Sequence, residues 1–452
     1  MKEGLELFVL RDEKGPILYA PLRNTVARLN EGAVASVTKH LYDMPLSEED
    51  KPVVEMLEKQ GFFEKVSPNF EPPKLPVQVT LFPSDGCNLR CRYCYAAAEK
   101  RRHKLPLEAA KAAVDYVAEN AKKLGNKDFV VGFHGNGEPF TNFELIKDIC
   151  IYAKEKAEEL GIEGHTTIAT NGAMPDEQLD WLLAWFDGVN ISSDVLPDLQ
   201  DHQRPFANGA GSFELVDRTL KRLDEAGKHY GIRATLTADS VGRLKELALF
   251  AAERYPNCEV LHVEPAWECG RCLRTGETTP DTAEFIRQFL EAEEALKGGK
   301  MKLVFSGARQ EHLTNRFCAA SADSFVLTSE GLVTSCYEVC ELSDERAERF
   351  VYGCYNPETK SFIFDREKMD ALHRMTVENM PECRDCFCKY HCAGDCPAKL
   401  LGLKEPEQHS GSQRCQIARA LTLRQITRKL EQAEAVPMPE DTTNAERMEE
   451  TK

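Results

Sequence analysis

The sequence predicts an α/β fold, with a parallel sheet of βα units between a small N-terminal domain and a cysteine-rich C-terminal domain. Three observations carry this prediction. Strand and helix patterns alternate over residues 77–297, and cysteines crowd the stretch 300–430. A proline-containing linker, Glu71 to Pro76, separates both from residues 1–72. The length of 452 residues is enough for this number of domains.

The composition is that of an ordinary folded protein and argues against two kinds of partner. A formal charge of −17 disfavours nucleic acid, because phosphate contacts need a basic surface. No apolar run reaches the roughly 18 residues of a membrane span, and the first residues lack the apolar core of a signal peptide. We therefore expect a cytoplasmic protein with no membrane partner. In that compartment the 17 cysteines are expected to bind metal rather than form disulfides.

Residues 1–72 are predicted to form a small α+β domain. Gly15–Pro21 has the composition of a short hairpin. Apolar spacing predicts one helix over Thr25–Tyr42 and a second over Glu48–Gln60. Ser47 is a suitable N-cap for the second helix, and Gly61 ends it.

Six βα units are predicted between residues 77 and 297. The expected strands are Val77–Phe82, Phe129–Phe133, His165–Ala169, Gly188–Ser192, Gly231–Thr237 and Glu259–Glu264. The expected helices are Pro106–Lys123, Asn142–Leu160, Asp176–Trp185, Ser212–Ala226, Arg243–Tyr255 and Thr282–Leu296. Right-handed crossovers make such units into a parallel sheet. Six units are too few for a closed eight-stranded barrel, and the pattern alone leaves a doubly wound sheet as the alternative.

After residue 300 the helical periodicity fades and short loops dominate, until Ile417–Leu430 again has a helical pattern. The tail 431–452 is acidic, contains proline and has almost no large apolar residues, so we expect it to be disordered.

A cysteine motif follows the first predicted strand. Cys87, Cys91 and Cys94 have C-x3-C-x2-C spacing, and three thiolates can bind three irons of a cubane and leave the fourth open. The motif resembles that of the radical SAM superfamily, with Tyr93 at the family's aromatic position. The resemblance implies a partial (β/α)6 TIM-like barrel and S-adenosylmethionine (SAM) on the open iron. It also implies a 5′-deoxyadenosyl radical that abstracts hydrogen from a substrate.

Further family motifs fall at the carboxyl ends of the predicted strands, where active sites of parallel βα folds gather. His134–Pro139 resembles the family's Gly-Gly-Gly-Glu-Pro, with Asn136 in place of the middle glycine. Thr170–Gly172 resembles Thr-Asn-Gly, and Ser192–Asp194 resembles Ser-x-Asp-Gly, with Val195 where glycine is usual. The resemblance implies that SAM is bound by Tyr93, Gly135, Asn136, Gly137, Glu138, Asn171, Ser192, Asp194 and Arg233.

Arg233 from this list and one further run of residues have open alternatives. Arg233 either points into the cavity, where it would pair with the SAM carboxylate, or is an exposed residue at a strand entrance. Asp201–Arg204 resembles the family's His-x-x-Arg run and lies either near the substrate or in a surface charge cluster.

A second cysteine constellation has C-x2-C-x5-C-x3-C spacing from Cys383 to Cys396. With Cys318, Gly331-x4-Cys336 and Cys415 it resembles the SPASM domain, which implies two auxiliary [4Fe–4S] clusters. By resemblance the outer cluster is held by Cys383, Cys386, Cys392 and Cys415, and the inner one by Cys318, Cys336 and Cys396. The inner cluster's fourth ligand is Cys340, Cys354 or none, and zinc is the rival metal for all these thiols. Cys269 and Cys272 fit no pattern and are either redox-active or ordinary thiols.

The resemblance implies an oxidoreductase that matures a ribosomally made peptide or a protein, reduced by a flavodoxin or ferredoxin. Candidate catalytic residues are Glu264, Tyr337 and Glu338. Tyr337, followed by Glu338, stands where sulfatase maturases place an aspartate base, and this departure argues against that activity. The first 72 residues loosely resemble leader-peptide recognition elements, with a plain packing domain as the alternative. The alternative functions are a radical SAM dehydrogenase or rearrangement enzyme on a small molecule, an iron–sulfur electron-transfer protein and a zinc-stabilised binding module.

Overall fold

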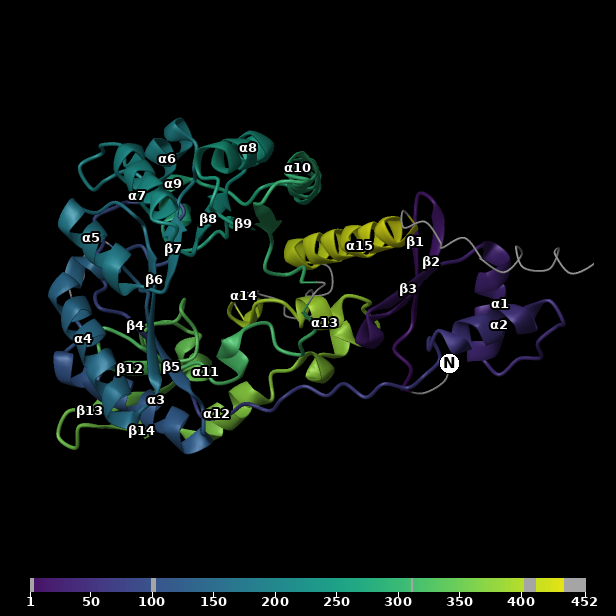
Figure 1. The fold of residues 1–452 in the computed structure, drawn as a ribbon, viewed down its shortest axis with the longest axis horizontal. Helices are drawn as coiled ribbons and strands as arrows, with labels where there is room; N and C mark the ends of the chain where they lie inside the picture. The colour runs from purple at the N-terminus through teal and green to yellow at the C-terminus, as the bar shows by residue number, and fades with distance from the viewer. Residues whose placement is uncertain (1–3, 99–102, 310–311, 402–411, 435–452) are drawn as a thin grey trace, which may run out of the picture. The chain divides into compact units, whose positions relative to one another are not determined.

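The computed structural model describes residues 4–98, 103–309, 312–401 and 412–434 (Figure 1). These residues form two compact units. The smaller unit contains the described residues up to Asn69 and those from Arg419 onward, and the larger unit spans Phe70–Ala418. The C-terminal helix α15 (Gln413–Glu434) therefore begins in the larger unit and ends in the smaller one.

The smaller unit combines a three-stranded antiparallel sheet with two helices. The strands are β1 (Phe8–Asp12), β2 (Gly15–Ala20) and β3 (Thr25–Arg28), and the helices are α1 (Glu31–Leu41) and α2 (Asp50–Lys59). Leu18, Val37 and Leu57 are fully buried in its core. Lys14 forms an ion pair of 3.3 Å with Glu431, which ties the end of α15 to this unit.

The prediction of one helix over Thr25–Tyr42 is wrong at its start. Thr25–Arg28 forms strand β3, in which the β-branched Val26 pairs with Tyr19 of β2. The helix begins only at Glu31, because the Asn30 side chain accepts a hydrogen bond of 2.8 Å from the Ala33 amide and caps it.

The second predicted helix also starts later than expected. Helix α2 begins at Asp50, with Glu49 rather than Ser47 at the N-cap position. The Ser47 hydroxyl still accepts a hydrogen bond of 3.3 Å from the Asp50 amide, so it stabilises the helix start from two residues before the N-cap.

The larger unit is built on a sheet whose strands follow the order β10-β9-β8-β7-β6-β5-β4-β11-β12-β13-β14. The parallel strands are β4 (Gln78–Leu81), β5 (Asp128–Phe133), β6 (Glu163–Thr170), β7 (Gly188–Ser192), β8 (Tyr230–Leu236), β9 (Val260–Pro265) and β10 (Lys302–Val304). Each lies beside its neighbour in sequence. This sequential order is that of a barrel, because a doubly wound sheet reverses its order at a switch point.

The helices between these strands agree with the predicted ones within one residue. They are α3 (Leu107–Leu124), α4 (Phe143–Leu160), α5 (Asp176–Trp185), α7 (Phe213–Glu225), α8 (Leu244–Arg254) and α10 (Thr282–Ala295). Two shorter helices, α6 (Pro197–Gln203) and α9 (Cys272–Thr275), lie in the loops after β7 and β9. Figure 1 shows α4, α5, α7 and α8 along the outer side of the strands. The strands thus expose their other face and their carboxyl ends to a common interior.

The cysteine-rich region continues the same sheet. Strands β11 (Val326–Leu327), β12 (Leu332–Thr334), β13 (Val351–Asn356) and β14 (Ser361–Phe364) extend it from β4. β11 is parallel to β4, and the other three are antiparallel. The short helices here are α11 (Ala347–Phe350), α12 (Arg366–His373), α13 (Lys389–Cys392) and α14 (Pro397–Leu401).

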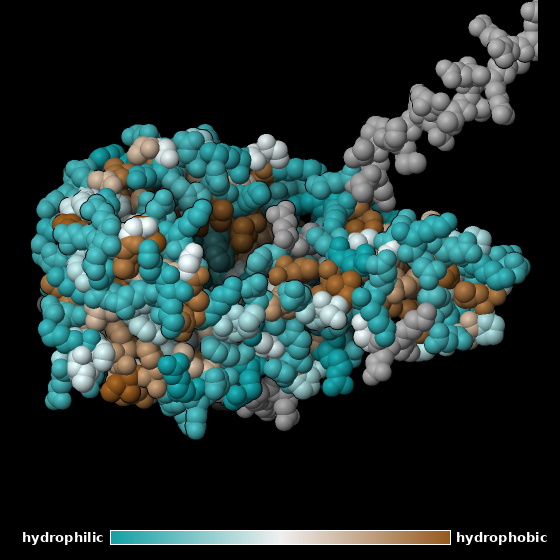
Figure 2. All heavy atoms as spheres, turned by 60° about the horizontal axis from the view of Figure 1, so that its bottom comes forward, coloured by the Kyte–Doolittle hydropathy of each residue, from teal (hydrophilic) through white to brown (hydrophobic). Residues whose placement is uncertain are grey.

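Helix α15 is longer than the predicted Ile417–Leu430 and ends four residues inside the stretch expected to be disordered. The rest of that predicted tail lies outside the described residues. In the part of the chain that the structure describes, we find no helix long and apolar enough to cross a bilayer. The space-filling view shows a mostly hydrophilic surface, and the larger unit is hollowed, with hydrophobic side chains lining part of the hollow (Figure 2).

Candidate functional site

Cys87, Cys91 and Cys94 lie on one loop after β4, and the loop after β5 packs directly against it. The Glu138 amide donates a hydrogen bond of 2.8 Å to the Gly86 carbonyl. A side chain at Gly137 would overlap the backbone of Asp85 and Gly86, so only glycine permits this approach. Cys91 and Cys94 are both electrostatic neighbours of Cys87. The three thiols therefore face one small region, as a shared cluster requires.

Glu138 is held by the end of β6. Its carboxylate accepts hydrogen bonds from the Thr170 hydroxyl at 2.6 Å and from the Asn171 amide at 2.8 Å. Burial raises the pKa of Glu138 to about 7. The Asn171 side chain in turn lies 3.9 Å from the Cys87 sulfur. Glu138 and Asn171 are thus brought to the cysteine loop, but the Glu138 carboxylate is bound within the protein.

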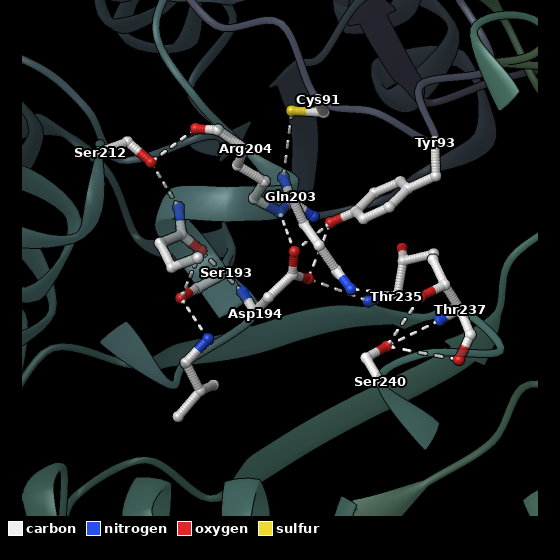
Figure 3. A network of polar contacts seen from close by, with 12 residues as sticks. Cys91, Tyr93, Ser193, Asp194, Gln203, Arg204, Ser212, Thr235, Thr237 and Ser240 are labelled. Atoms are coloured by element: carbon white, nitrogen blue, oxygen red, sulfur yellow. Dashed lines mark hydrogen bonds and ion pairs between the residues drawn. The ribbon is translucent and has the colours of Figure 1, made fainter. Parts of the chain in front are cut away.

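Asp194 is the centre of a buried polar network at the end of β7 (Figure 3). It is 1% exposed and accepts hydrogen bonds from the Tyr93 hydroxyl at 2.6 and 2.7 Å. Arg204 Nε donates to it at 3.2 Å, and Arg204 Nη1 lies 3.9 Å from the Cys91 sulfur. Burial raises the pKa of Asp194, although Arg204 and Tyr93 act in the opposite direction. Tyr93 is therefore hydrogen-bonded to Asp194, and Asp194 holds Arg204 beside the Cys91 sulfur.

Val195 keeps the loop shape that glycine usually provides. Its φ angle is +65°, in the left-handed region that a β-branched residue rarely adopts. The Ser193 hydroxyl accepts a hydrogen bond of 3.0 Å from the Val195 amide, and the Gln200 side chain accepts one of 2.8 Å from the Asp194 amide. These buried hydrogen bonds thus stabilise the left-handed turn, although it carries valine in place of the family's glycine.

Arg233 is exposed rather than buried, on the face of β8 opposite the buried Ile232 and Ala234. The burial of His134 lowers its pKa to about 4, with a smaller contribution from the positive charge of Arg233. Arg233 therefore faces the same interior as the loop after β5. Ser192, Gly135 and Asn136 are partly exposed at the ends of their strands.

Tyr337 lies against the loop after β5. Its ring stacks on His134 with ring centres 4.9 Å apart, and its hydroxyl is 3.1 Å from Thr80 Oγ1 of β4. Glu338 points elsewhere, toward Arg346 at 3.6 Å and Lys399 at 3.9 Å. The two residues are therefore adjacent in sequence but belong to different surroundings.

Glu264 is not free to act as a base. It is 5% exposed and accepts a hydrogen bond of 2.7 Å from Arg414, whose Nε lies 3.0 Å from Asp395. Burial alone would raise the pKa of Glu264, but Arg414 and His262 hold it well below its usual range. Glu264 thus links the end of β9 to residues that adjoin Cys396 and Cys415.

The cysteines of the second constellation gather in two groups. Burial, with smaller contributions from the neighbouring Cys386 and Cys415, raises the pKa of Cys383 to about 12. Cys392 has the same three thiols as neighbours. Cys388, which fits no pattern, lies in this group too, with its sulfur 3.4 Å from that of Cys386. Cys318, Cys336 and Cys396 form the second group, since Cys318 and Cys396 are both neighbours of Cys336.

Cys340 and Cys354, the two candidates for a fourth ligand in the second group, lie in different places. Cys340 is 6% exposed and packs on Phe82 and Val326, and its thiol donates to the Tyr337 carbonyl at 3.2 Å. Cys354 pairs with Leu332 on the neighbouring strand, four residues before Cys336. At about 3.3 Å per residue this puts Cys354 about 13 Å from Cys336.

A parallel barrel with three thiols at the carboxyl end of its first strand defines an α/β protein of the iron–sulfur type. Residues 81–248 match the radical SAM superfamily. This part of the larger unit is thus a radical SAM domain.

Its curated relatives share moderate identity. A cysteine-type anaerobic sulfatase-maturating enzyme of Clostridium perfringens is 18% identical over 71% of this chain and 89% of its own. The sporulation killing factor maturation protein SkfB of Bacillus subtilis is 21% identical over 58% of this chain and 60% of its own. The Fe-coproporphyrin III synthase of Methanosarcina barkeri is 26% identical over 45% and 48%.

Solved structures show the same fold. Native anSMEcpe with bound AdoMet has a TM-score of 0.59, covering 79% of this chain and 99% of that one at 15% identity. Streptococcus suis SuiB bound to the precursor peptide SuiA has a TM-score of 0.53, covering 89% and 97% at 18% identity.

Sequence reasoning misses the buried arginines of the site. The sequence pattern places Arg204 near the substrate or on the surface, yet it is 6% exposed and joins Cys91 to Asp194. Arg414 belongs to no motif, although it directly precedes Cys415. The only available signal is position: each arginine stands close in sequence to a motif residue.

Proposed function

We propose that this radical SAM enzyme oxidatively modifies a peptide or protein, using one SAM-binding and two auxiliary [4Fe–4S] clusters. The single observation that carries the proposal is the loop of Cys87, Cys91 and Cys94, which the loops after β5 and β7 hold from two sides. The bound cluster and SAM would supply a 5′-deoxyadenosyl radical for hydrogen abstraction. The residues around the loop would bind, orient and shield it.

The chain's own groups fit such a cluster. Asn171 and Arg204 direct N–H groups toward the sulfurs of Cys87 and Cys91, each at 3.9 Å, and such contacts stabilise the negative charge of thiolates. Tyr93 and Asp194 would fix Arg204 in place. Burial raises the pKa of Cys87 to about 12, so iron must displace its proton.

Arg233, Ser192 and Asn136 are the groups we propose for SAM itself, since they are partly or fully exposed in the common interior. Arg233 would pair with the SAM carboxylate. Glu138 would act on the SAM site through the backbone, because its carboxylate is bound to Thr170 and Asn171. The exclusion of water falls to the buried Tyr93 and Leu89.

Removing one hydrogen atom leaves a substrate that must lose a further electron and a proton to complete a two-electron oxidation. We propose that the auxiliary clusters accept the electron, and that Tyr337 or Glu338 accepts the proton. A tyrosine hydroxyl is protonated at neutral pH, since its ordinary pKa is about 10. Glu338 is therefore the better acceptor. Glu264 is excluded from this role by its bond to Arg414.

A peptide substrate is favoured over a small molecule by the extent of the likeness. The sulfatase-maturating relative matches 71% of this chain, whereas the porphyrin-synthesis relative matches 45%. The likeness to SuiB covers 89% of the chain, which is more than the larger unit alone contains. This supports a leader-peptide role for the smaller unit. The porphyrin-synthesis relative makes a small-molecule substrate the second candidate.

The test is anaerobic turnover of the reconstituted full chain with SAM, dithionite and synthetic peptides from open reading frames beside its gene. We expect about twelve irons per chain, 5′-deoxyadenosine, and a peptide that has lost two hydrogens. Cys91→Ala is the control and should form no 5′-deoxyadenosine. Zinc in place of iron, or an intact reduced cluster without SAM cleavage, would contradict the proposal. 5′-Deoxyadenosine with every peptide unchanged would favour the small-molecule candidate.

A further inference from the structure

Within the proposed function, one iron of the inner auxiliary cluster lacks an assigned protein ligand. The segment Cys269–Cys272, which fits no motif, follows β9 and lies between the two cysteine regions. The Arg271 amide donates a hydrogen bond of 2.9 Å to the Cys94 carbonyl, and its side chain donates one of 2.6 Å to the Cys91 carbonyl. A side chain at Gly270 would overlap the carbonyls of Cys94 and Tyr95. The segment is therefore fixed against the radical SAM loop on one side.

Its other side faces the inner group of thiols. Lys399, three residues after Cys396, lies 5.9 Å from the centre of the Trp267 ring, two residues before Cys269. Lys399 is also 3.9 Å from Glu338, two residues after Cys336. Lys399, near Cys396, thus lies against residues near both Cys269 and Cys336, although the three cysteines come from three separate parts of the chain.

The electrostatic neighbours agree with this placement. Burial, with a smaller contribution from the Glu338 carboxylate, raises the pKa of Cys269 to about 11. The same carboxylate raises the pKa of Cys318, Cys336 and Cys396. Cys269 therefore shares one carboxylate neighbour with the three inner thiols, as Cys340 also does. Lys399 and Arg346, which hold that carboxylate, would also offset the negative charge of a cluster with four thiolates.

We propose that Cys269 supplies the fourth protein ligand of the inner auxiliary cluster, across from Cys318, Cys336 and Cys396. The inference rests on the proposed function, because it assumes that these thiols hold iron. Cys340 is the weaker candidate, since it packs between Phe82 and Val326 with its thiol donating to a carbonyl. Cys354 lies at the far end of its hairpin.

Two consequences follow for the reaction. With four protein ligands the inner cluster would have no open iron for the substrate, and it would accept an electron across space rather than through a bond to the substrate. The ligand segment also joins the two cluster regions, because Arg271 donates to carbonyls on the loop of the SAM-binding cysteines. Substitutions at Cys269 would therefore affect both the inner auxiliary cluster and the SAM-binding cluster.

The test uses the full chain with Cys87, Cys91 and Cys94 changed to alanine, so that only auxiliary clusters form and no SAM chemistry is needed. Cys269→Ala in this background should give about one [3Fe–4S] electron paramagnetic resonance signal per chain after mild oxidation, from near zero in the background. The signal of the reduced cluster should also shift when imidazole is added. Cys272→Ala, in the same segment, is the matched control and should change neither.

If Cys269→Ala loses the inner cluster altogether, iron falls by about four per chain, which also supports the proposal provided that Cys272→Ala keeps it. Cys269→Ser should then restore the cluster with a shifted signal, since its oxygen can bind iron. A [3Fe–4S] signal in the background itself, or one caused by Cys340→Ala and not by Cys269→Ala, overturns it. Bound zinc without iron would instead mark failure of the proposed function.

Discussion

Two buried arginines occupy matched places beside the two cysteine regions, and they differ in what they join. Arg204 pairs with Asp194 next to Cys91, and Arg414 pairs with Asp395 and Glu264 next to Cys415. Both side chains are almost fully buried, at 7% and 3% exposure. Asp194 lies ten residues before its partner Arg204 in the sequence, whereas Glu264 lies 150 residues before its partner Arg414.

The difference shows how each cysteine region is stabilised. Asp194 keeps the Tyr93 hydroxyl and the Thr235 amide as partners besides its arginine, so its site has several anchors from one barrel. Arg414 joins two carboxylates from two different parts of the larger unit, and of these Glu264 also contacts the His262 ring and the Ser306 amide. The link between β9 and the auxiliary region therefore runs through a single arginine side chain, whereas Arg204 pairs within one loop.

The largest expected effect is that of Arg414→Met. It leaves Asp395 buried without its arginine and Glu264 with only His262 and the Ser306 amide, which should cost about 3–5 kcal/mol and lower the thermal midpoint. Auxiliary iron should be lost before SAM cleavage is. The control is Arg243→Met at a partly exposed ion pair with Asp198, where the cost should stay below about 1 kcal/mol. Equal losses in both variants would refute the special role of Arg414.

Arg204→Met should cost less, about 3 kcal/mol, because Asp194 retains its other hydrogen bonds. Its main consequence should be loss of the SAM-binding cluster, seen as lost 5′-deoxyadenosine. The cost should also depend on pH. Since the folded-state pKa of Asp194 is raised, its protonated form favours the fold at low pH, and this stability is lost as pH rises through that pKa.

Thermal unfolding of Arg204→Met at several pH values from acid to neutral checks this. The deficit relative to the unchanged protein should shrink toward acid pH. A deficit that grows toward acid pH would show that Asp194 is not the group left unpaired.

Gly137→Ala tests the close packing of the loop after β5 against the cysteine loop, a contact that involves no charge. A side chain there overlaps the Gly86 backbone, which should move the cysteine loop and slow SAM cleavage at least about tenfold, or about 1.4 kcal/mol. Gly135→Ala is the matched variant, because its added carbon would have no neighbour closer than 3.4 Å. Similar rates in the two variants would mean that the close approach is unimportant.

The smallest effect concerns Val195. Since its φ is +65°, Val195→Gly should be more stable than Val195→Ala by about 1 kcal/mol, the reverse of the usual order. Both variants lose the same buried side chain apart from one methyl group, so their difference reports the backbone. Comparing their thermal midpoints tests this, and a more stable alanine variant would exclude a left-handed backbone at this turn.

The sequence alone determined the alternation of the barrel. Predicted helices such as Asp176–Trp185 and strands such as Gly188–Ser192 agree with the structure, because their signals are local periodicity and turn residues. The helix predicted from Thr25 failed, because pairing with β2 outweighs local apolar spacing there. Strands β11 and β12 were missed, since strands of two or three residues carry no detectable period.

Only the tertiary structure decided which polar groups are free. Sequence motifs brought Glu138, Asp194 and Glu264 forward as site residues, but each carboxylate is bound inside the protein. The same folding brings Cys269 beside Glu338, near cysteines far along the chain. Spacing fixes which thiols are near one another within a loop, whereas burial and contacts between distant segments decide what each group can do. Those depend on the whole fold and leave no local trace in the sequence.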